Sequence, residues 1–275
     1  MDRLFVTWRY RSFFGFWPRL SRPRRFSEKV QKAKLTWRTP LLTALADKVA
    51  AKRVVAERLG SACVTPNLFV GDQLPPRAER TWPTPYVIKV NHRSGGNIFV
   101  SSAEGHDWEQ TERRIAYWLR RPHGHQLGEW AYRNVRPQVL IEPMLDDPDQ
   151  LRDYKVFVFG GRARYVQIHA ERLSGHKCCF YDLNWNKLPF TLKWPLDPTD
   201  YPRPDCLAEL IAGAEELGRG LPFVRADFYV IEGRPRFGEV TFYPGSGLQH
   251  FKPDAMDFEL GALWPDGLPA DQVGT

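Results

Sequence analysis

Hydrophobic residues recur along this chain with two different periods. Between residues 39 and 59 they return at steps of three and four, which is typical of an amphipathic helix, and Gly60 is a natural helix stop. Residues 109–119 and 206–217 also have helical patterns. We therefore predict three helices in the body of the chain, separated by segments with a different pattern.

The segments between these helices are short runs of β-branched and aromatic residues, which favour strands. The runs are residues 68–70, 86–90, 97–100, 139–142, 154–159, 163–168, 223–231 and 236–242. Several are joined in pairs by polar or glycine-rich turns, as in a hairpin. Hairpins combined with a few helices predict an α+β fold rather than a doubly wound parallel sheet.

The last hairpin carries one carboxylate on each strand, Asp227 and Glu239. We predict a three-residue turn at residues 232–234, which would pair the two directly on one face, whereas a two-residue turn would put them on opposite faces. Opposed carboxylates repel each other, so such a pair favours a cation, and hard oxygen ligands suit Mg²⁺. The alternative is a register in which each carboxylate is separately exposed.

The first hairpin has features of an anion-binding site. Lys89 lies near the end of its first strand, and the loop that follows contains Ser94, Gly95 and Gly96. Glycines let several N–H groups approach a phosphate, and the lysine adds a positive charge. A strand follows where a Walker loop would need a helix, so this is not a Walker loop. Lys52 is a second candidate cation. Both lysines could equally be ordinary surface residues.

Composition places the chain among soluble globular proteins. No run approaches the roughly 20 apolar residues of a membrane-spanning helix, and the first residues lack the pattern of a secretory signal. The four cysteines have neither CxxC nor metal-ligand spacing, so we expect free thiols in a reducing compartment. These features favour the cytoplasm.

Positive charge is concentrated at the N-terminus. Residues 1–38 contain eleven Lys or Arg and two acidic residues, a net charge of 11 − 2 = +9, against +7 for the whole chain. The same segment contains many aromatic residues. It could contact an anionic membrane surface, or it could pack on the body through its aromatic face, which we slightly favour. The body has no recognisable nucleic-acid-binding motif, so we expect no nucleic-acid partner.

Five motifs in a fixed order resemble the TupA-like branch of the ATP-grasp superfamily. They are Lys89 with residues 91–96, Asp153-Tyr154-Lys155, Tyr181-Asp182 with Trp185, Arg225-Ala226-Asp227-Phe228-Tyr229, and residues 238–247. The resemblance covers about residues 41–261 and implies two α+β subdomains that grip ATP between antiparallel sheets. We accordingly predict an N-terminal arm at residues 1–38 and an ATP-grasp domain at 39–275. Within that domain we expect the phosphate loop in residues 39–140 and the metal site in residues 141–275.

The resemblance also implies a role for each matching position. Residues implied to contact ATP are Lys52, Lys89, His92, Ser94, Gly95, Gly96, Glu142, Leu145 and Asp153, with Glu142 to Leu145 as the hinge that reads adenine. Residues implied to be catalytic are Lys155, Arg172 and Arg225. Metal ligands implied are Asp227 and Glu239. Thr241 stands where the superfamily often has asparagine, and this leaves the number of metal ions open. The sequence around Arg172 departs from the branch pattern.

The chemistry implied is ligation of a carboxylate to an amine, with ATP and Mg²⁺ as cofactors and an acylphosphate as the intermediate. The implied setting is cell-surface polysaccharide biosynthesis, with a uronic acid as the carboxylate substrate and an amino acid or glutamyl chain as the amine. Two alternatives stay open. A glycosyltransferase would also use paired carboxylates, a metal and a nucleotide, and a sugar kinase would need a base such as Asp182.

Overall fold

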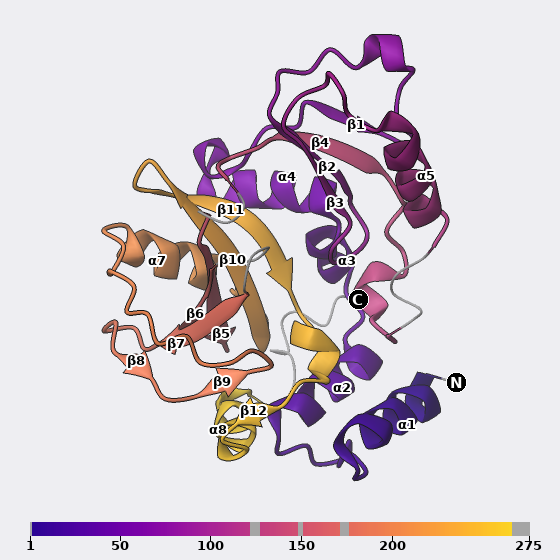
Figure 1. Cartoon of the computed structure of the whole chain (residues 1–275). Helices are drawn as coiled ribbons and strands as arrows, with labels where there is room; N and C mark the ends of the chain where they lie inside the picture. The colour runs from indigo at the N-terminus through magenta and orange to yellow at the C-terminus, as the bar shows by residue number, and fades with distance from the viewer. Residues whose placement is uncertain (1, 122–126, 148–150, 171–175, 266–275) are drawn as a thin grey trace. The chain divides into compact units, whose positions relative to one another are not determined.

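The computed structural model describes residues 2–121, 127–147, 151–170 and 176–265. The chain divides into two compact units, which are described separately (Figure 1). The small unit is residues 40–147, and the large unit is residues 1–39 together with 148–275. No helix in the described part of the chain combines the length and apolar content that crossing a membrane requires.

The small unit is a four-stranded antiparallel sheet with helices packed against it. Its strands are β1 (Phe69–Gly71), β2 (Tyr86–Val90), β3 (Asn97–Val100) and β4 (Val139–Pro143), in the order β1-β4-β2-β3. Its helices are α3 (Pro40–Ala46), α4 (Lys48–Leu59) and α5 (Trp108–Leu119), with single turns η1 (Ser61–Cys63), η2 (Arg77–Glu79) and η3 (Trp130–Tyr132). Ile115 and Trp118 of α5 pack on alternate residues of β2, β3 and β4 to form the core.

Residues 39–59 form two helices rather than the single predicted helix. The break is at Asp47, whose carboxylate accepts a hydrogen bond from the amide of Val49 (2.9 Å) and caps α4. An aspartate at this position stabilises a helix start because it satisfies an N–H group that has no partner in the helix. The hydrophobic period runs on through the break, so the pattern alone does not reveal it.

The large unit is built on a six-stranded antiparallel sheet in the order β11-β10-β5-β6-β7-β8. These strands are β5 (Asp153–Phe159), β6 (Arg162–Ala170), β7 (Lys177–Tyr181), β8 (Lys187–Leu188), β10 (Phe223–Ile231) and β11 (Arg234–Thr241). A separate ribbon pairs β9 (Thr191–Leu192) with β12 (Phe251–Lys252). The helices are α1 (Asp2–Phe14), α2 (Phe26–Thr36), α7 (Leu207–Leu217) and α8 (Ala255–Leu263), and η4 (Pro244–Gly247) follows β11.

The two faces of this sheet differ because side chains alternate along each strand. One face is apolar and is covered by α7 (Figure 1). The other face changes character along the strands. At one end Phe159 and Phe223 pack against Phe26 of α2 (ring centroids 6.1 and 5.0 Å apart), and at the other end the same face carries the charged residues Lys155 and Asp227.

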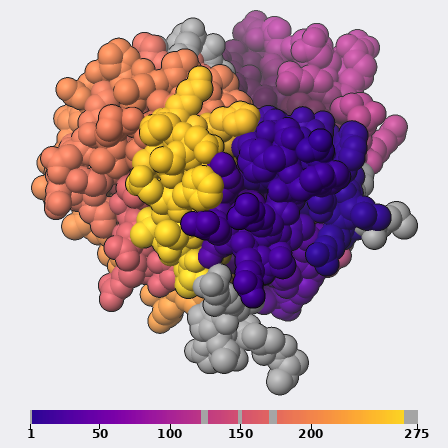
Figure 2. Space-filling view, turned by 90° about the horizontal axis from the view of Figure 1, so that it is seen from below, coloured from indigo at the N-terminus to yellow at the C-terminus, as the bar shows by residue number. Residues whose placement is uncertain are grey.

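The N-terminal helices belong to the same compact unit as the C-terminal segment, and Figure 2 shows the two segments side by side at the surface. Ser27 of α2 donates from its amide (2.8 Å) and its hydroxyl (2.7 Å) to the buried carboxylate of Asp257 in α8. Tyr10 of α1 is hydrogen-bonded to the Ser27 hydroxyl (3.0 Å). Residues 1–38 therefore include a helix whose inner side belongs to the core.

Candidate active site

Asp227 and Glu239 are direct partners in the β10–β11 ladder, as predicted. The predicted three-residue turn is wrong, because Ile231 pairs with Arg234 and only Glu232 and Gly233 form the turn. Both turn residues have positive φ (51° and 74°), as a two-residue hairpin turn requires. A two-residue turn alone would separate the carboxylates, so a second irregularity must restore the register.

That irregularity is a β-bulge at Gly238. Phe228 pairs with Phe237, but Asp227 pairs with Glu239, so Gly238 is an extra residue that shifts the ladder by one. A Cβ atom at position 238 would lie 3.1 Å from the Asp227 carbonyl oxygen and 3.3 Å from the Tyr229 ring. Glycine thus permits the close backbone approach that brings the two carboxylates onto one face.

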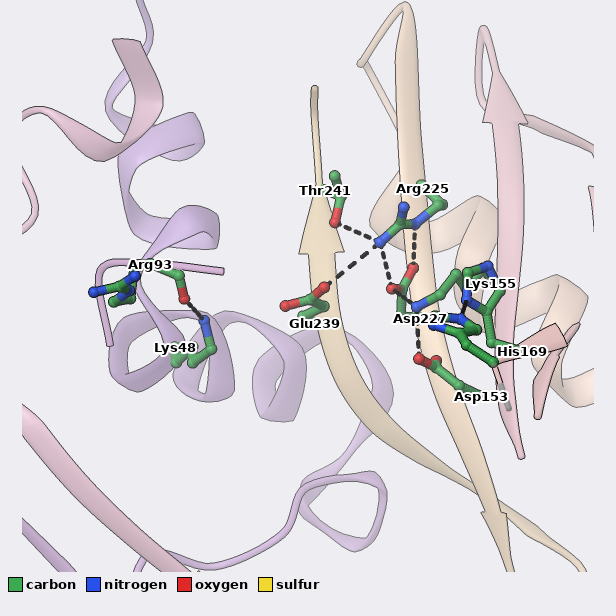
Figure 3. Close-up of polar contacts among 10 residues, drawn as sticks. Lys48, Arg93, Asp153, Lys155, His169, Arg225, Asp227, Glu239 and Thr241 are labelled. Atoms are coloured by element: carbon green, nitrogen blue, oxygen red, sulfur yellow. Dashed lines mark hydrogen bonds and ion pairs between the residues drawn. The ribbon is translucent and has the colours of Figure 1, made fainter. Parts of the chain in front are cut away.

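Two cations hold the Asp227 carboxylate (Figure 3). Arg225 donates to it from Nε (2.7 Å) and Nη2 (2.6 Å), and Lys155 donates from Nζ. Lys155 also donates to Asp153 (2.6 Å) on the same strand. Arg225 Nη2 lies 3.5 Å from Glu239 Oε1, so the guanidinium is close to both carboxylates. These contacts link three carboxylates and two cations on one face of the sheet.

Burial and charge act against each other in this cluster. Burial raises the pKa of Asp227, while the charges of Arg225 and Lys155 oppose that rise. Burial alone would lower the pKa of Arg225, but its hydrogen bonds to Asp227 and the charges of the neighbouring carboxylates together raise the pKa. The guanidinium is therefore a permanent cation next to the paired carboxylates.

Asp227 and Glu239 have the donor chemistry that Mg²⁺ prefers, namely carboxylate oxygens on one face. Among the described residues no group of three or more His, Cys, Asp or Glu side chains is arranged to hold a metal ion. Mg²⁺ usually takes one or two carboxylates and completes its shell with water and phosphate, so two carboxylates are enough to hold it. The Glu239 side chain is 37 % exposed, whereas that of Asp227 is 2 % exposed, so a metal would reach Glu239 first.

A second charged cluster lies within the small unit. The Glu142 carboxylate, at the end of β4, forms ion pairs with both Lys52 of α4 and Lys89 of β2. Burial alone would raise the pKa of Glu142, but the charges of Lys89 and Lys52 lower it to about 2. Burial lowers the pKa of Lys52. The structure thus brings together the two lysines expected to contact phosphate, around a carboxylate whose pairing the sequence did not reveal.

The loop after β2 is anchored at its base and exposed at its tip. Lys48 donates to the Arg93 carbonyl oxygen (2.7 Å; Figure 3), and Asn91 donates to the Asp47 carboxylate (2.9 Å). Ser94 and Gly95 at the tip are exposed.

His92 lies apart from that tip. Its ring is buried, with its nitrogens 3.3 Å from the Asn91 side-chain oxygen and from the Arg121 carbonyl oxygen. Burial lowers its pKa, which favours the neutral ring. A phosphate contact from this ring stays a prediction.

A scan against protein-family models matches the TupA-like ATP-grasp family over residues 28–264. The chain belongs to this family. Its fold is accordingly the α+β ATP-grasp fold, in which both the small and the large unit are built on antiparallel sheets. A search of curated proteins found no match.

Solved structures resemble this ATP-grasp chain in fold at low sequence identity. An L-amino acid ligase from Bacillus licheniformis is 13% identical with a TM-score of 0.50, covering 90% of this chain and 58% of that one. A D-alanine–D-alanine ligase from Helicobacter pylori is 18% identical with a TM-score of 0.43, covering 82% and 61%. The same ligase from Bacillus anthracis, complexed with ATP, is 16% identical with a TM-score of 0.41, covering 73% and 56%. The chain thus spans about six tenths of the length of these proteins.

The remaining positions implied by the ATP-grasp resemblance have different surroundings. Leu145 is half-buried and follows Met144, whose amide donates to the Pro85 carbonyl oxygen (3.0 Å). Asp182 accepts hydrogen bonds from the amides of Asn184 (2.9 Å) and Asn186 (2.8 Å), so its carboxylate shapes a turn. Arg172 lies outside the described residues.

Sequence reasoning missed two groups of this ATP-grasp chain that hold the η4 loop. The buried ammonium of Lys34 in α2 donates to the Ser246 carbonyl (2.7 Å) and hydroxyl (2.6 Å) oxygens. Gln31, one turn earlier, donates to the carbonyl oxygens of Ser246 (2.9 Å) and Gly247 (3.1 Å). These bonds fix Ser246 in a left-handed conformation (φ 59°) that is costly for a residue with a side chain. Only the crowding of Lys and Arg in this segment, interpreted as surface charge, was visible in the sequence.

Beside this loop is a cavity of about 900 Å³ within the large unit. Its lining includes Gly245 from the η4 loop, Trp194 after β9 and His250 before β12. Lys193 and Lys252 also line it, and the lining residues that the structure describes include no acidic one. The cavity therefore favours negatively charged molecules.

Proposed function

We propose that this protein is an ATP-dependent carboxylate–amine ligase that works through an acylphosphate. The observation that carries the proposal is the direct pairing of Asp227 with Glu239 next to Arg225 and Lys155, in a chain of the ATP-grasp family. Paired carboxylates provide for a metal, and adjacent cations provide for the negative charge that gathers when a phosphoryl group is transferred.

Lys52 and Lys89 are the groups that we propose for the phosphates of ATP. Both are paired with Glu142, so a phosphate would compete with this carboxylate for the same ammonium groups. The N–H groups of the exposed residues Ser94 and Gly95 would add donors. Closure of this loop over the phosphates would exclude water from a reactive acylphosphate.

Asp227 and Glu239 would hold Mg²⁺, which would supply neutralisation of charge on the phosphate oxygens. A cation bound to Asp227 would compete with Arg225 and Lys155 for the carboxylate. These two side chains would then be available to the reacting carboxylate and the acylphosphate. Arg172 stays a proposed contact of the acceptor carboxylate.

The reaction has two steps. A carboxylate oxygen attacks the γ-phosphorus, the bond from this phosphorus to the bridging oxygen breaks, and ADP leaves. The amine nitrogen then attacks the acyl carbon, the bond from that carbon to the phosphate-bearing oxygen breaks, and phosphate leaves as the nitrogen loses a proton. Neither step needs a nucleophilic side chain, because the substrates supply both nucleophiles.

We propose a uronic acid of a cell-surface glycan as the carboxylate and an amino acid or glutamyl chain as the amine, with the reaction in the cytoplasm. Two features support this setting. The cavity beside the η4 loop, lined by Lys193 and Lys252, suits an anionic acceptor. The four cysteines are free thiols, as expected in a reducing compartment.

The experiment is to incubate the protein with Mg·ATP, candidate uronic acids and amino acids, and to measure ADP, AMP and product mass together. We expect ADP with an amide product. Positional isotope exchange in ATP with the carboxylate alone would report a reversible acylphosphate.

Asp227→Asn should abolish both the amide product and the isotope exchange. Asp182→Asn, which alters a carboxylate that shapes a turn, should retain both. A phosphorylated sugar that forms without amine and disappears in Asp182→Asn would instead identify a kinase. Dependence on a nucleotide sugar would identify a glycosyltransferase.

A further inference from the structure

Helix α1 buries only one side of its surface. Val6 and Tyr10, one turn apart, are buried, and the Tyr10 hydroxyl is hydrogen-bonded to Ser27 of α2 (3.0 Å). These contacts dock the helix on the large unit. They also fix which residues of α1 face outward, because residues three and four apart share a helix face.

The outward face of α1 carries large apolar side chains next to exposed polar ones. Leu4 is 79% exposed and Trp8, one turn later, is 61% exposed, with Phe5 beside them. The chain continues after the helix into Phe16 and Trp17, which are also exposed. In the described residues, six of the ten exposed large apolar side chains lie between positions 4 and 17, so exposure is concentrated here rather than scattered.

Arginines lie beside these apolar side chains. The Arg9 guanidinium lies 6.0 Å from the Phe5 ring centroid, and that of Arg11 lies 5.1 Å from the ring centroid of Trp17. The only acidic residue in α1 is Asp2, at its N-terminal end. Large apolar and aromatic side chains next to basic ones are the residue types with which helices bind a membrane interface.

We propose that the outward face of α1 binds the surface of an anionic lipid bilayer. Leu4, Phe5 and Trp8 would enter the boundary between headgroups and acyl chains, where indole rings are favoured. Arg9 and Arg11 would reach the lipid phosphates while their aliphatic stems stay with the apolar side chains. Three arginines against one aspartate give α1 itself a positive charge that complements an anionic surface. This inference goes beyond the proposed ligase activity and does not depend on it.

The test is co-sedimentation of the full chain with vesicles of phosphatidylcholine alone or with about one third phosphatidylglycerol. We expect binding to the anionic vesicles that falls as salt is raised, and little binding to the neutral ones. The double variant Leu4→Ser/Trp8→Ser should lose at least about ten-fold in partitioning, since two large side chains no longer leave water. Leu196→Ser, at an exposed leucine elsewhere in the large unit, should bind as the unchanged protein does.

Two results would overturn the proposal. The first is equal binding of the double variant and the unchanged protein. The second is self-association of the lipid-free protein that the double variant abolishes, since the face would then be covered by another copy of the chain. Circular dichroism and ATP binding of the double variant establish that the fold is retained, because Val6 and Tyr10 are untouched.

Discussion

Replacing Glu142 with glutamine measures how much the carboxylate charge that pairs with Lys52 and Lys89 contributes to stability. The pKa of this carboxyl group is lowered from 4.5 to about 2, and its side chain is 8% exposed, so solvent screens the pairing little. Each pKa unit corresponds to about 1.36 kcal/mol, so a difference of about 2.5 corresponds to about 3 kcal/mol of folding free energy at neutral pH. Glu142→Gln keeps the shape of the side chain and removes this contribution.

The stability lost in Glu142→Gln should depend on pH, in the direction that the lowered pKa of Glu142 sets. The pKa is lower in the folded state, so the stabilisation is fully present above the ordinary value of 4.5 and is lost as pH falls towards 2. We expect Glu142→Gln to cost about 3 kcal/mol at pH 7 and about 1 kcal/mol at pH 3. Urea unfolding of both proteins across this range, followed by tryptophan fluorescence, measures the difference.

Glu112 provides a matched control in the same unit. Hydrogen bonds from Arg77 and Arg80 lower its pKa to about 2 as well, but its side chain is 33% exposed. Exposed ion pairs contribute roughly 0–1 kcal/mol, so Glu112→Gln should be the milder change. Equal losses in the two variants, or a loss in Glu142→Gln that does not change with pH, would refute the reasoning.

Three further changes test other parts of the site. Lys89→Ala should weaken ATP binding about ten-fold or more in calorimetry, since a charge-assisted bond contributes about 1.5–3 kcal/mol, while replacement of the exposed Arg113 of α5 by alanine should not. Gly238→Ala should lower the free energy of unfolding by about 1–3 kcal/mol, because its Cβ crowds the neighbouring strand, and an unchanged denaturation midpoint would contradict the bulge geometry. Lys34→Met should speed amide hydrogen exchange in the η4 loop, whereas Lys32→Met, a half-buried neighbour on the same helix, should leave it as it is.

Strands with strong local patterns could be predicted from the sequence closely. β2, β3 and β10 have the predicted bounds, because β-branched runs between glycine-rich or polar turns identify a strand locally. β7 was not predicted, and neither were β8, β9 and β12, whose two residues each are too few to show a period. Their pairing comes from tertiary packing, which local patterns do not report.

The candidate site, too, could be predicted only in part from the sequence. The pairing of Asp227 with Glu239 followed from counting residues, although the extra residue is Gly238 and not a third turn residue. The ion pair between Lys155 and Asp227 joins residues 72 positions apart, on strands whose adjacency depends on the whole sheet. A single sequence does not reveal how these strands pair, so the cluster of three carboxylates and two cations could be recognised only in the structure.

The bulge at Gly238 also bears on which insertions and deletions the hairpin tolerates. An odd number of residues separates Asp227 from Glu239, and the extra residue can lie either in the turn or in the strand. Moving the extra residue from the strand to the turn, by inserting one residue next to Gly233 and deleting Gly238, would keep the number of residues between the two carboxylates and leave them opposed. A hairpin with a three-residue turn and no bulge would therefore oppose the same two carboxylates.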